Sequence, residues 1–175
     1  MNRQIAVRMR SAIAVLLTLA ALLGLSSTAL AAGNDKKSDG QFTGIALVTS
    51  DLNWYALFAR PEVPRIKGKD KFAPGERGAI AIIFSNAEPR DGKLKIVCDI
   101  TAFDAKGSKA IAKGTVCYEG PYAGKNVLHP SLVDLQFEIT ETDAAGEAGF
   151  KIKLRDAYSS RHVDLKVTYE QDTAR

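Results

Sequence analysis

The sequence is poor in the side chains on which most catalytic and metal sites depend. Its 175 residues include two histidines, two cysteines, two methionines and one tryptophan. It contains no G-x-S-x-G, H-E-x-x-H, P-loop or dinucleotide-binding glycine pattern. These absences argue against the common nucleophilic, zinc-dependent and nucleotide-dependent enzymes. We therefore expect no cofactor and no metal site.

Two pairs of polar residues have spacings that metal or acid–base sites also use. His162 and Asp164 lie two apart in a predicted strand, but two ligands do not make a metal site, and a solvated strand edge explains them equally well. Asp134 and Glu138 share a strand face, which superficially matches the paired carboxylates of glycosidases. That face is the polar side of an amphipathic strand, so solvation is the simpler interpretation.

A strong net charge is also missing once the N-terminal segment is set aside. The whole chain carries +4, from 24 basic and 20 acidic residues. Three arginines and no acidic residue lie within residues 1–31, so 21 basic and 20 acidic residues remain, a net charge of +1. A nearly balanced surface gives no electrostatic footprint for nucleic acid or for an anionic membrane. We therefore reject nucleic acid as a partner.

Residues 1–31 have the three parts of a cleavable signal peptide. Three arginines form a positive n-region, residues 12–25 form an apolar h-region, and residues 29–31 (Ala-Leu-Ala) fit a small-x-small cleavage site. The alternative is an uncleaved anchor, because no charge interrupts residues 11–33 and about 20 apolar residues can span a bilayer. We expect cleavage, and hence a periplasmic or secreted protein.

The chain after the signal divides into a leader, one domain and a short tail. Residues 32–42 are polar, charged and without period, which predicts a disordered leader. Residues 43–171 are sufficient for a single domain with a sizeable core. Residues 172–175 are expected to fray.

Hydrophobic alternation predicts an all-β fold. Residues 133–140, 148–155 and 163–170 alternate apolar and polar side chains, which is typical of strands with one face in a core and one in water. Residues 78–86 are apolar on both faces, which predicts a fully buried strand. With a short strand before these and a hairpin at 93–119, about seven strands and no long helix are expected. The predicted architecture is a two-layer antiparallel β-sandwich of immunoglobulin-like type, and a closed barrel is the alternative.

Both cysteines lie in the hairpin predicted at residues 93–119. Gly107-Ser108 suits a two-residue type II′ turn, because glycine supplies the positive φ that this turn requires. That turn places Cys98 opposite Cys117. Two cysteines in an exported chain favour a disulfide, and closing a loop of this length contributes on the order of 3 kcal/mol.

Residues 50–60 are ambiguous between a short helix and a strand, and we favour the helix slightly because a proline follows it. The only tryptophan, Trp54, lies here with Tyr55 and Phe58. Three such rings are able to form a stacking platform for a sugar or a peptide. A core or lid role is more common for aromatic side chains, because they bury large areas.

A long loop, residues 118–130, connects the hairpin to the C-terminal strands. It contains two glycines and two prolines together with Tyr118, Tyr122, Asn126 and His129. Unstructured loops of this length are often functional, and tyrosine supplies rigid amphipathic contact area at a small entropic cost. The hypothesis is that these four residues contact a partner. The alternative is a crossover whose tyrosines cap the core.

Two functions from different classes agree with these features. The first is an exported, non-enzymatic binding or protein-interaction module of the cell envelope, with an envelope or extracellular protein as partner, because loops of β-sandwiches commonly carry recognition. The second is a β-sandwich hydrolase that uses His129 or His162 as its base. The two differ in a spatial requirement: an enzyme needs one of these histidines beside a second polar group in a concave pocket.

Overall fold

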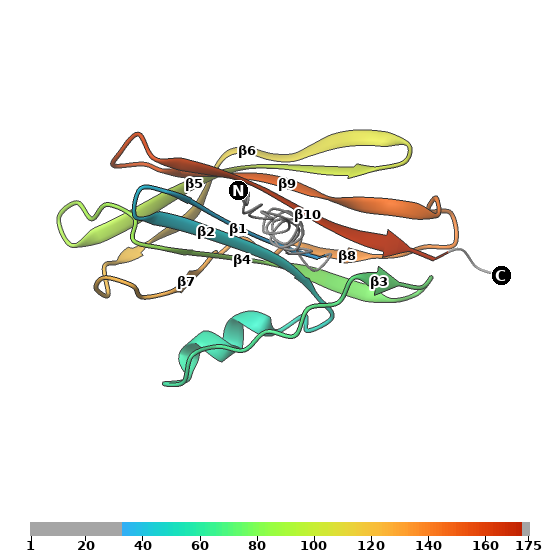
Figure 1. The fold of residues 1–175 in the computed structure, drawn as a ribbon, viewed down its shortest axis with the longest axis horizontal. Helices are drawn as coiled ribbons and strands as arrows, with labels where there is room; N and C mark the ends of the chain where they lie inside the picture. The colour runs from blue at the N-terminus through green and yellow to red at the C-terminus, as the bar shows by residue number, and fades with distance from the viewer. Residues whose placement is uncertain (1–32, 173–175) are drawn as a thin grey trace, which may run out of the picture.

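The computed structural model describes residues 33–172, which form two packed β-sheets (Figure 1). Sheet A is built from β1 (Asn34–Asp39), β2 (Phe42–Thr49), β4 (Arg77–Ser85), β7 (His129–Pro130) and β8 (Gln136–Glu138). Sheet B is built, in spatial order, from β3 (Lys71–Phe72), β10 (His162–Gln171), β9 (Gly146–Asp156), β5 (Lys93–Asp104) and β6 (Gly107–Pro121). The predicted all-β sandwich is confirmed.

The immunoglobulin-like assignment stays a prediction. The order of sheet A is β1-β2-β4, and the short strands β7 and β8 both pair with the far edge of β4. The disulfide joins β5 and β6, which are neighbours in sheet B. In antibody domains the hallmark disulfide instead joins the two sheets. Residues 33–172 contain no helix long and apolar enough to span a bilayer.

The core between the sheets follows the alternation in the sequence. On β9, Ile152 is buried and its neighbour Lys151 is exposed. On β10, Leu165 is buried and its neighbour Lys166 is exposed. Strand β4 is buried on both faces, as predicted. The side chains that fill the inter-sheet core from β4 and β5 are Ile80, Ile82, Phe84, Leu94, Ile96, Cys98 and Ile100.

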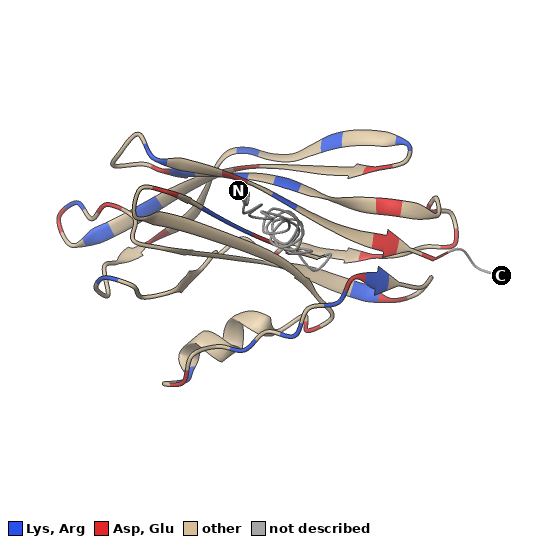
Figure 2. Ribbon diagram, viewed as in Figure 1, with Lys and Arg blue, Asp and Glu red and all other residues tan. Residues whose placement is uncertain are grey.

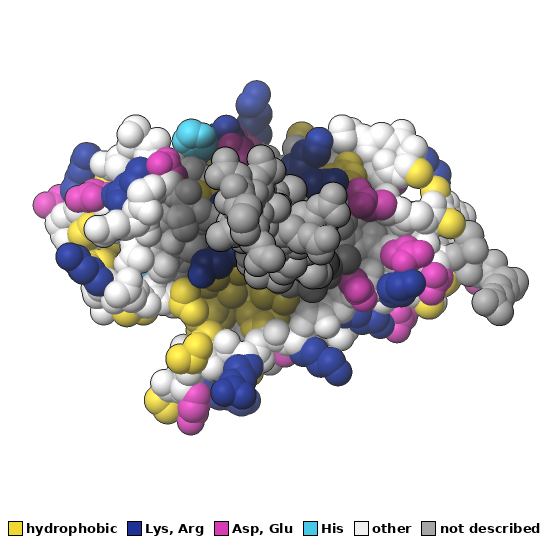
Figure 3. Space-filling view, viewed as in Figure 1, with side chains coloured by type: hydrophobic (Ala, Val, Ile, Leu, Met, Phe, Trp, Pro, Cys, Tyr) yellow, Lys and Arg dark blue, Asp and Glu magenta, His cyan; other side chains and the backbone are white. Residues whose placement is uncertain are grey.

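A strap (residues 50–70) covers the outer face of sheet A. It begins with the 3-10 helix η1 (Trp54–Ala59), so the favoured short helix is confirmed. Thr49 Oγ1 donates to the Lys67 carbonyl at 2.8 Å, which ties the end of the strap to β2. The strap accounts for the second apolar face of β4, because Trp54 packs there in a cluster of its own. Hydrophobic side chains are visible between the strap and sheet A in Figure 3.

Strand β1 corrects the expectation that residues 32–42 form a disordered leader. Residues 34–39 pair antiparallel with β2 along their whole length. The Asp35 and Asp39 carboxylates accept hydrogen bonds from the backbone N–H groups of Lys166 and His162, at 2.9 and 3.0 Å. A polar strand is stable here because its carboxylates satisfy the otherwise unpaired edge of β10.

The register predicted for the cysteine hairpin is wrong. Asp104 pairs with Gly107, so the turn lies at residues 105 and 106, two positions before the predicted one. Asp104 Oδ1 accepts hydrogen bonds from the backbone N–H groups of Lys106 and Gly107, at 2.7 and 3.0 Å. An aspartate that bonds the backbone two residues ahead fixes a turn, and this favours the earlier position.

The disulfide is present even though the register differs from the predicted one. Cys98 lies opposite Thr115 in the ladder, and three register shifts interrupt the pairing of β5 with β6. These shifts bring the Cα atoms of Cys98 and Cys117 to 5.8 Å, within the range that a disulfide spans. The predicted bond is confirmed.

The strand predicted at residues 133–140 is mostly absent. Only β8, three residues long, pairs with β4. The chain before it crosses between the sheets: the Leu132 N–H donates to the Cys117 carbonyl of β6 at 2.7 Å, and Leu135 accepts from Ile80 of β4 at 2.9 Å. A segment that changes partner within four residues cannot form one long ladder.

Candidate functional site

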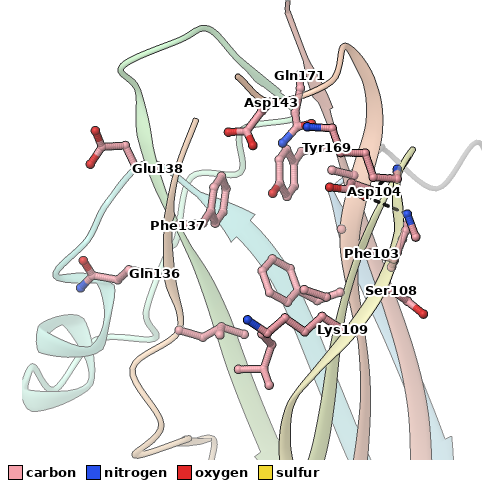
Figure 4. A pocket seen from close by; sticks show the side chains of 18 residues that line it. Phe103, Asp104, Ser108, Lys109, Gln136, Phe137, Glu138, Asp143, Tyr169 and Gln171 are labelled. Carbon is pink, nitrogen blue, oxygen red and sulfur yellow. Dashed lines mark hydrogen bonds between the residues drawn. The ribbon is translucent and has the colours of Figure 1, made fainter. Parts of the chain in front are cut away.

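A cavity of about 540 Å³ opens at one end of the sandwich, between β8 of sheet A and β6 of sheet B (Figure 4). Sites for small ligands typically measure about 300 to 1,000 Å³. We call this space the end cavity. Its principal side chains come from five strands and one loop: Phe103, Asp104, Lys109, Ile111, Phe137, Asp143, Phe150 and Tyr169.

Aromatic rings contributed by both sheets line the floor of the end cavity. Phe137 of β8 stacks on Tyr169 of β10, with ring centroids 4.4 Å apart and planes 10° from parallel. The centroid of the Phe150 ring lies 6.2 Å from that of Phe137. Gly78 makes room for this arrangement, because a Cβ atom there would collide with the Phe137 ring. The alternation of β8 directs Phe137 inward and its neighbours Gln136 and Glu138 away (Figure 4).

Two carboxylates and a phenol form one pole of the end cavity. Asp104 and Asp143 each use one oxygen to hold a turn, and Asp143 Oδ2 accepts from the Thr140 N–H at 2.7 Å. Burial, with smaller contributions from the nearby Asp143 and Asp104 charges, raises the pKa of Tyr169 to about 12. The Tyr169 phenol is therefore protonated at neutral pH and able to donate a hydrogen bond. Acidic residues gather at this end of the molecule in Figure 2.

A lysine lies farther along the same wall. Lys109 extends from β6 toward the end cavity (Figure 4). Within residues 33–172 it takes part in no ion pair. The neighbouring Lys106 differs, because its ammonium donates to the Thr142 carbonyl at 2.9 Å. Lys109 is thus a cation with no carboxylate partner in the described part of the chain.

The loop that the sequence singled out lies at the opposite end of the sandwich (Figure 1). Tyr118 belongs to β6 and His129 to β7, and both pack against Phe84 of β4. The His129 ring stacks on the Phe84 ring, with centroids 5.3 Å apart. The Tyr118 ring meets the His129 ring edge-on, with centroids 5.2 Å apart. The structure brings two of the four predicted contact residues together, as members of a packed aromatic cluster.

The other two predicted contact residues also make internal contacts. Asn126 and Asn86 bond each other: the Asn126 N–H donates to Asn86 Oδ1 at 2.7 Å, and Asn86 Nδ2 donates to Asn126 Oδ1 at 3.2 Å. Both have positive φ, 61° and 56°. Tyr122 is half-buried against the core. These positions agree with the crossover alternative, and partner contact by the four residues stays a prediction.

Neither histidine lines the end cavity. His129 is 6% exposed, and burial lowers its pKa. His162 is exposed, with Nε2 3.8 Å from Asp164 Oδ2. This pair gains no third ligand, because residues 33–172 contain no group of three or more His, Cys, Asp or Glu side chains suited to a metal ion.

The remaining polar pair and the aromatic strap have structural environments. Asp134 accepts from Gln136 Nε2 at 3.0 Å on an exposed segment. Trp54 is buried on sheet A, and Phe58 meets it edge-on at 6.1 Å. Tyr55 alone of the strap's three rings is largely exposed, at 54%. Trp54 therefore has the core role that was the alternative to a stacking platform.

Sequence reasoning missed the end cavity. The alternation over residues 133–140 and 163–170 predicts that Phe137 and Tyr169 face inward, but it does not tell which inward residues of the two sheets meet. The approach of Asp104 to Asp143 depends on two turns that are distant in sequence. The one available signal was the run of small residues around Gly149, where a Cβ atom would meet the β10 backbone and Phe103.

Comparison with known proteins identifies no family. No protein-family model matches the chain, and no curated protein matches it. Among solved structures, the chain is similar to a family 123 glycoside hydrolase from Clostridium perfringens, studied for glycolipid glycan hydrolysis, with a TM-score of 0.44 and 8% identity. The match covers 75% of this chain and 27% of that one. Similarity at this level carries no argument about function.

Proposed function

We propose that this chain is an exported, non-enzymatic binding module whose ligand site is the end cavity. The composition of the cavity carries the proposal. Its aromatic floor is contributed by both sheets, Asp104 and Asp143 lie at one pole, and Lys109 lies on the wall. An apolar surface with a few fixed polar groups is the usual composition of a ligand site.

The polar groups of the end cavity favour binding over chemistry. Asp104 and Asp143 are engaged in turns, and the Tyr169 phenol stays protonated. Ser108 is the cavity's only serine, and no histidine lines the cavity beside it. A hydroxyl nucleophile needs an adjacent base to be activated. These side chains are suited to donating and accepting hydrogen bonds from a bound molecule.

The competing hypothesis is a β-sandwich hydrolase with His129 or His162 as base. His129 packs against Phe84 and Tyr118, and the exposed His162 ring lies 3.8 Å from the Asp164 carboxylate. Hydrolysis of nitrophenyl ester and glycoside substrates is the direct assay. Turnover that disappears in His129→Gln or His162→Gln, with folding intact by circular dichroism, would favour the enzyme.

The proposed export is supported by the disulfide, which persists in oxidising compartments. The expected signal at residues 1–31 lies outside the described residues. We expect an envelope or extracellular location and removal of residues up to about Ala31. Intact-mass measurement of protein from the envelope fraction checks this, because a mass matching all 175 residues would favour an uncleaved anchor.

The binding proposal is tested by amide chemical-shift mapping on ¹⁵N-labelled protein, in the form recovered from cells. The probes are indole, N-acetyl-phenylalaninamide and N-acetylglucosamine. We expect at least one probe to shift the amides around Phe137, Lys109 and Tyr169. Shifts centred on residues 122–128 would instead place the site on the loop that the sequence singled out.

Two exposed residues of β6 provide a matched pair of variants. Ile111 lines the end cavity and is 49% exposed, whereas Val116 does not line it and is 44% exposed. Ile111→Asp should abolish probe binding without unfolding the domain. Val116→Asp should leave probe binding unchanged. Equal binding by both variants would contradict the proposed site.

A further inference from the structure

Two edge strands with free backbone groups flank the end cavity. β8 pairs only with β4, and β6 pairs only with β5, within residues 33–172. Nine of the first ten residues of β6, Gly107–Val116, are exposed. The first backbone bond that another segment makes to the outer edge of β6 is at the Cys117 carbonyl. This edge presents a row of unpaired N–H and C=O groups.

The other edges of the sandwich are short or covered. β3, β7 and β8 have two or three residues each. On the side of β10 that faces away from β9, the N–H groups of Lys166 and His162 bond Asp35 and Asp39 of β1, and that of Glu170 bonds the Asp70 carbonyl. Residues 107–116 of β6 contain no proline and carry two lysines. The ladder is unbroken over residues 107–110, which at about 3.3 Å per residue offer a free edge of about 13 Å, and the edge continues past the bulge at Ile111.

The side chains along this edge form an ordered series on the cavity side. Asp104 lies opposite Gly107 at the turn, with Asp143 at the same pole. Lys109 and Ile111 follow at intervals of two residues and line the cavity. The series from the turn is therefore anionic, cationic and apolar. Ile111 is the extra residue of a bulge, because Ala110 and Ala112 pair with the consecutive residues Thr101 and Ile100. All three groups nevertheless line the end cavity, so an added strand would meet them with one of its faces.

We infer that the end cavity takes an extended polypeptide segment, which adds antiparallel to the free edge of β6 between that strand and β8. This inference rests on the proposed function above. The segment carries, on alternate positions in chain order, an apolar, an acidic and a basic residue. The apolar side chain lies by Ile111 over the aromatic floor, the acidic one by Lys109, and the basic one by Asp104 and Asp143. Main-chain bonds give affinity and these side chains give specificity.

Two peptides of identical composition test the inference. The matched probe is acetyl-Thr-Leu-Thr-Glu-Thr-Lys-Thr-amide, and the control exchanges its glutamate and lysine. Opposite charges across a strand pair contribute about 0.2 to 1 kcal/mol each, and like charges cost a similar amount. Reversing both pairs should therefore weaken binding roughly tenfold. Lys109→Glu should reduce this preference or reverse it, and isothermal titration calorimetry measures all four combinations.

Amide hydrogen exchange supplies a readout specific to strand addition. Bound matched peptide should slow the exchange of alternate amides between Ser108 and Ala112, because their N–H groups gain partners. Equal affinity for both peptides, or binding with unchanged exchange in β6, would overturn the inference while leaving the binding module in place. Absence of peptide binding in protein that still binds the small probes would overturn it in the same way. Failure of peptides and small probes alike would remove the proposed function as well.

Discussion

Phe137 of sheet A lies face to face with Tyr169 of sheet B, 4.4 Å between ring centroids, and joins the two layers at the end cavity. Phe72 meets both rings edge-on, at 5.0 and 5.5 Å. Phe137→Ala should lower the free energy of unfolding by about 3 kcal/mol, because a large ring is lost from a packed cluster. Phe137→Leu should cost less. Urea unfolding measures both, and equal stability of Phe137→Ala and the wild type would contradict the packing role.

The Cys98–Cys117 disulfide should stabilise the domain without taking part in binding. Reduction, or replacement of both cysteines by alanine, should lower the free energy of unfolding by about 3 kcal/mol in the chain-entropy account. Binding of small probes at low temperature should persist, because both sulfur atoms are buried away from the cavity lining. Free thiols detected in oxidised, unfolded protein would refute the bond.

Tyr122→Ala separates a core role from a contact role for the loop at residues 122–128. The ring is half-buried against the inter-sheet core, and the Tyr122 N–H donates to the Gly92 carbonyl at 2.9 Å. We expect a loss of about 2 kcal/mol in unfolding free energy. Stability that holds while a co-purifying partner is lost would instead support the contact hypothesis.

His129 should make the domain sensitive to mild acid. Burial lowers its pKa in the folded state, so its contribution to stability is complete above the unfolded pKa of about 6.5. That contribution decreases as the pH falls below this value, because the unfolded chain binds the proton more readily. His129→Phe should remove this part of the pH dependence between pH 7 and 5. The check is the thermal unfolding midpoint across that range, and parallel profiles for the two proteins would contradict it.

The carboxylate of Asp35 should stabilise the closure of β1 against β10. It is nearly buried and accepts the Lys166 N–H, so its removal leaves a donor unpaired. Asp35→Ala should cost about 2 kcal/mol. Lys36→Ala, at an exposed position on the same strand, is the control and should change stability by less than about 0.5 kcal/mol. Equal effects of the two changes would show that the carboxylate has no special role.

The sequence was sufficient to predict a strand and its buried residues where one face of the strand is exposed to solvent or where both faces are buried. The alternation of β9 and β10 correctly assigned Ile152 and Leu165 to the core, and the double apolar pattern of β4 indicated cover on both sides. That cover proved to be the strap with Trp54. In each case the apolar pattern predicts that a face is buried, and this prediction does not depend on which segment covers that face.

The sequence was insufficient where a strand depends on distant polar partners. β1 buries little apolar surface, and its polar residues suggested disorder. Its bonds go to Lys166 and His162, more than 120 residues away. One local signal was overlooked: the two-residue loop Gly40-Gln41 has glycine, at φ 59°, in its first position, which is typical of a type II′ hairpin. The end cavity was unpredictable for a related reason, because its side chains come from five strands.

The contacts between β1 and β10 also constrain when the domain becomes complete. Hydrogen bonds join Asp35 to Lys166 and Asp39 to His162, at sequence separations of 131 and 123 residues. Loop-closure entropy opposes such pairings until the intervening chain has condensed, and proteins dominated by distant contacts fold slowly. The N-terminal strand leaves the ribosome first, yet its docking must await β10. Until β10 packs, the Asp35 and Asp39 carboxylates lack the backbone donors that they bond in the complete domain.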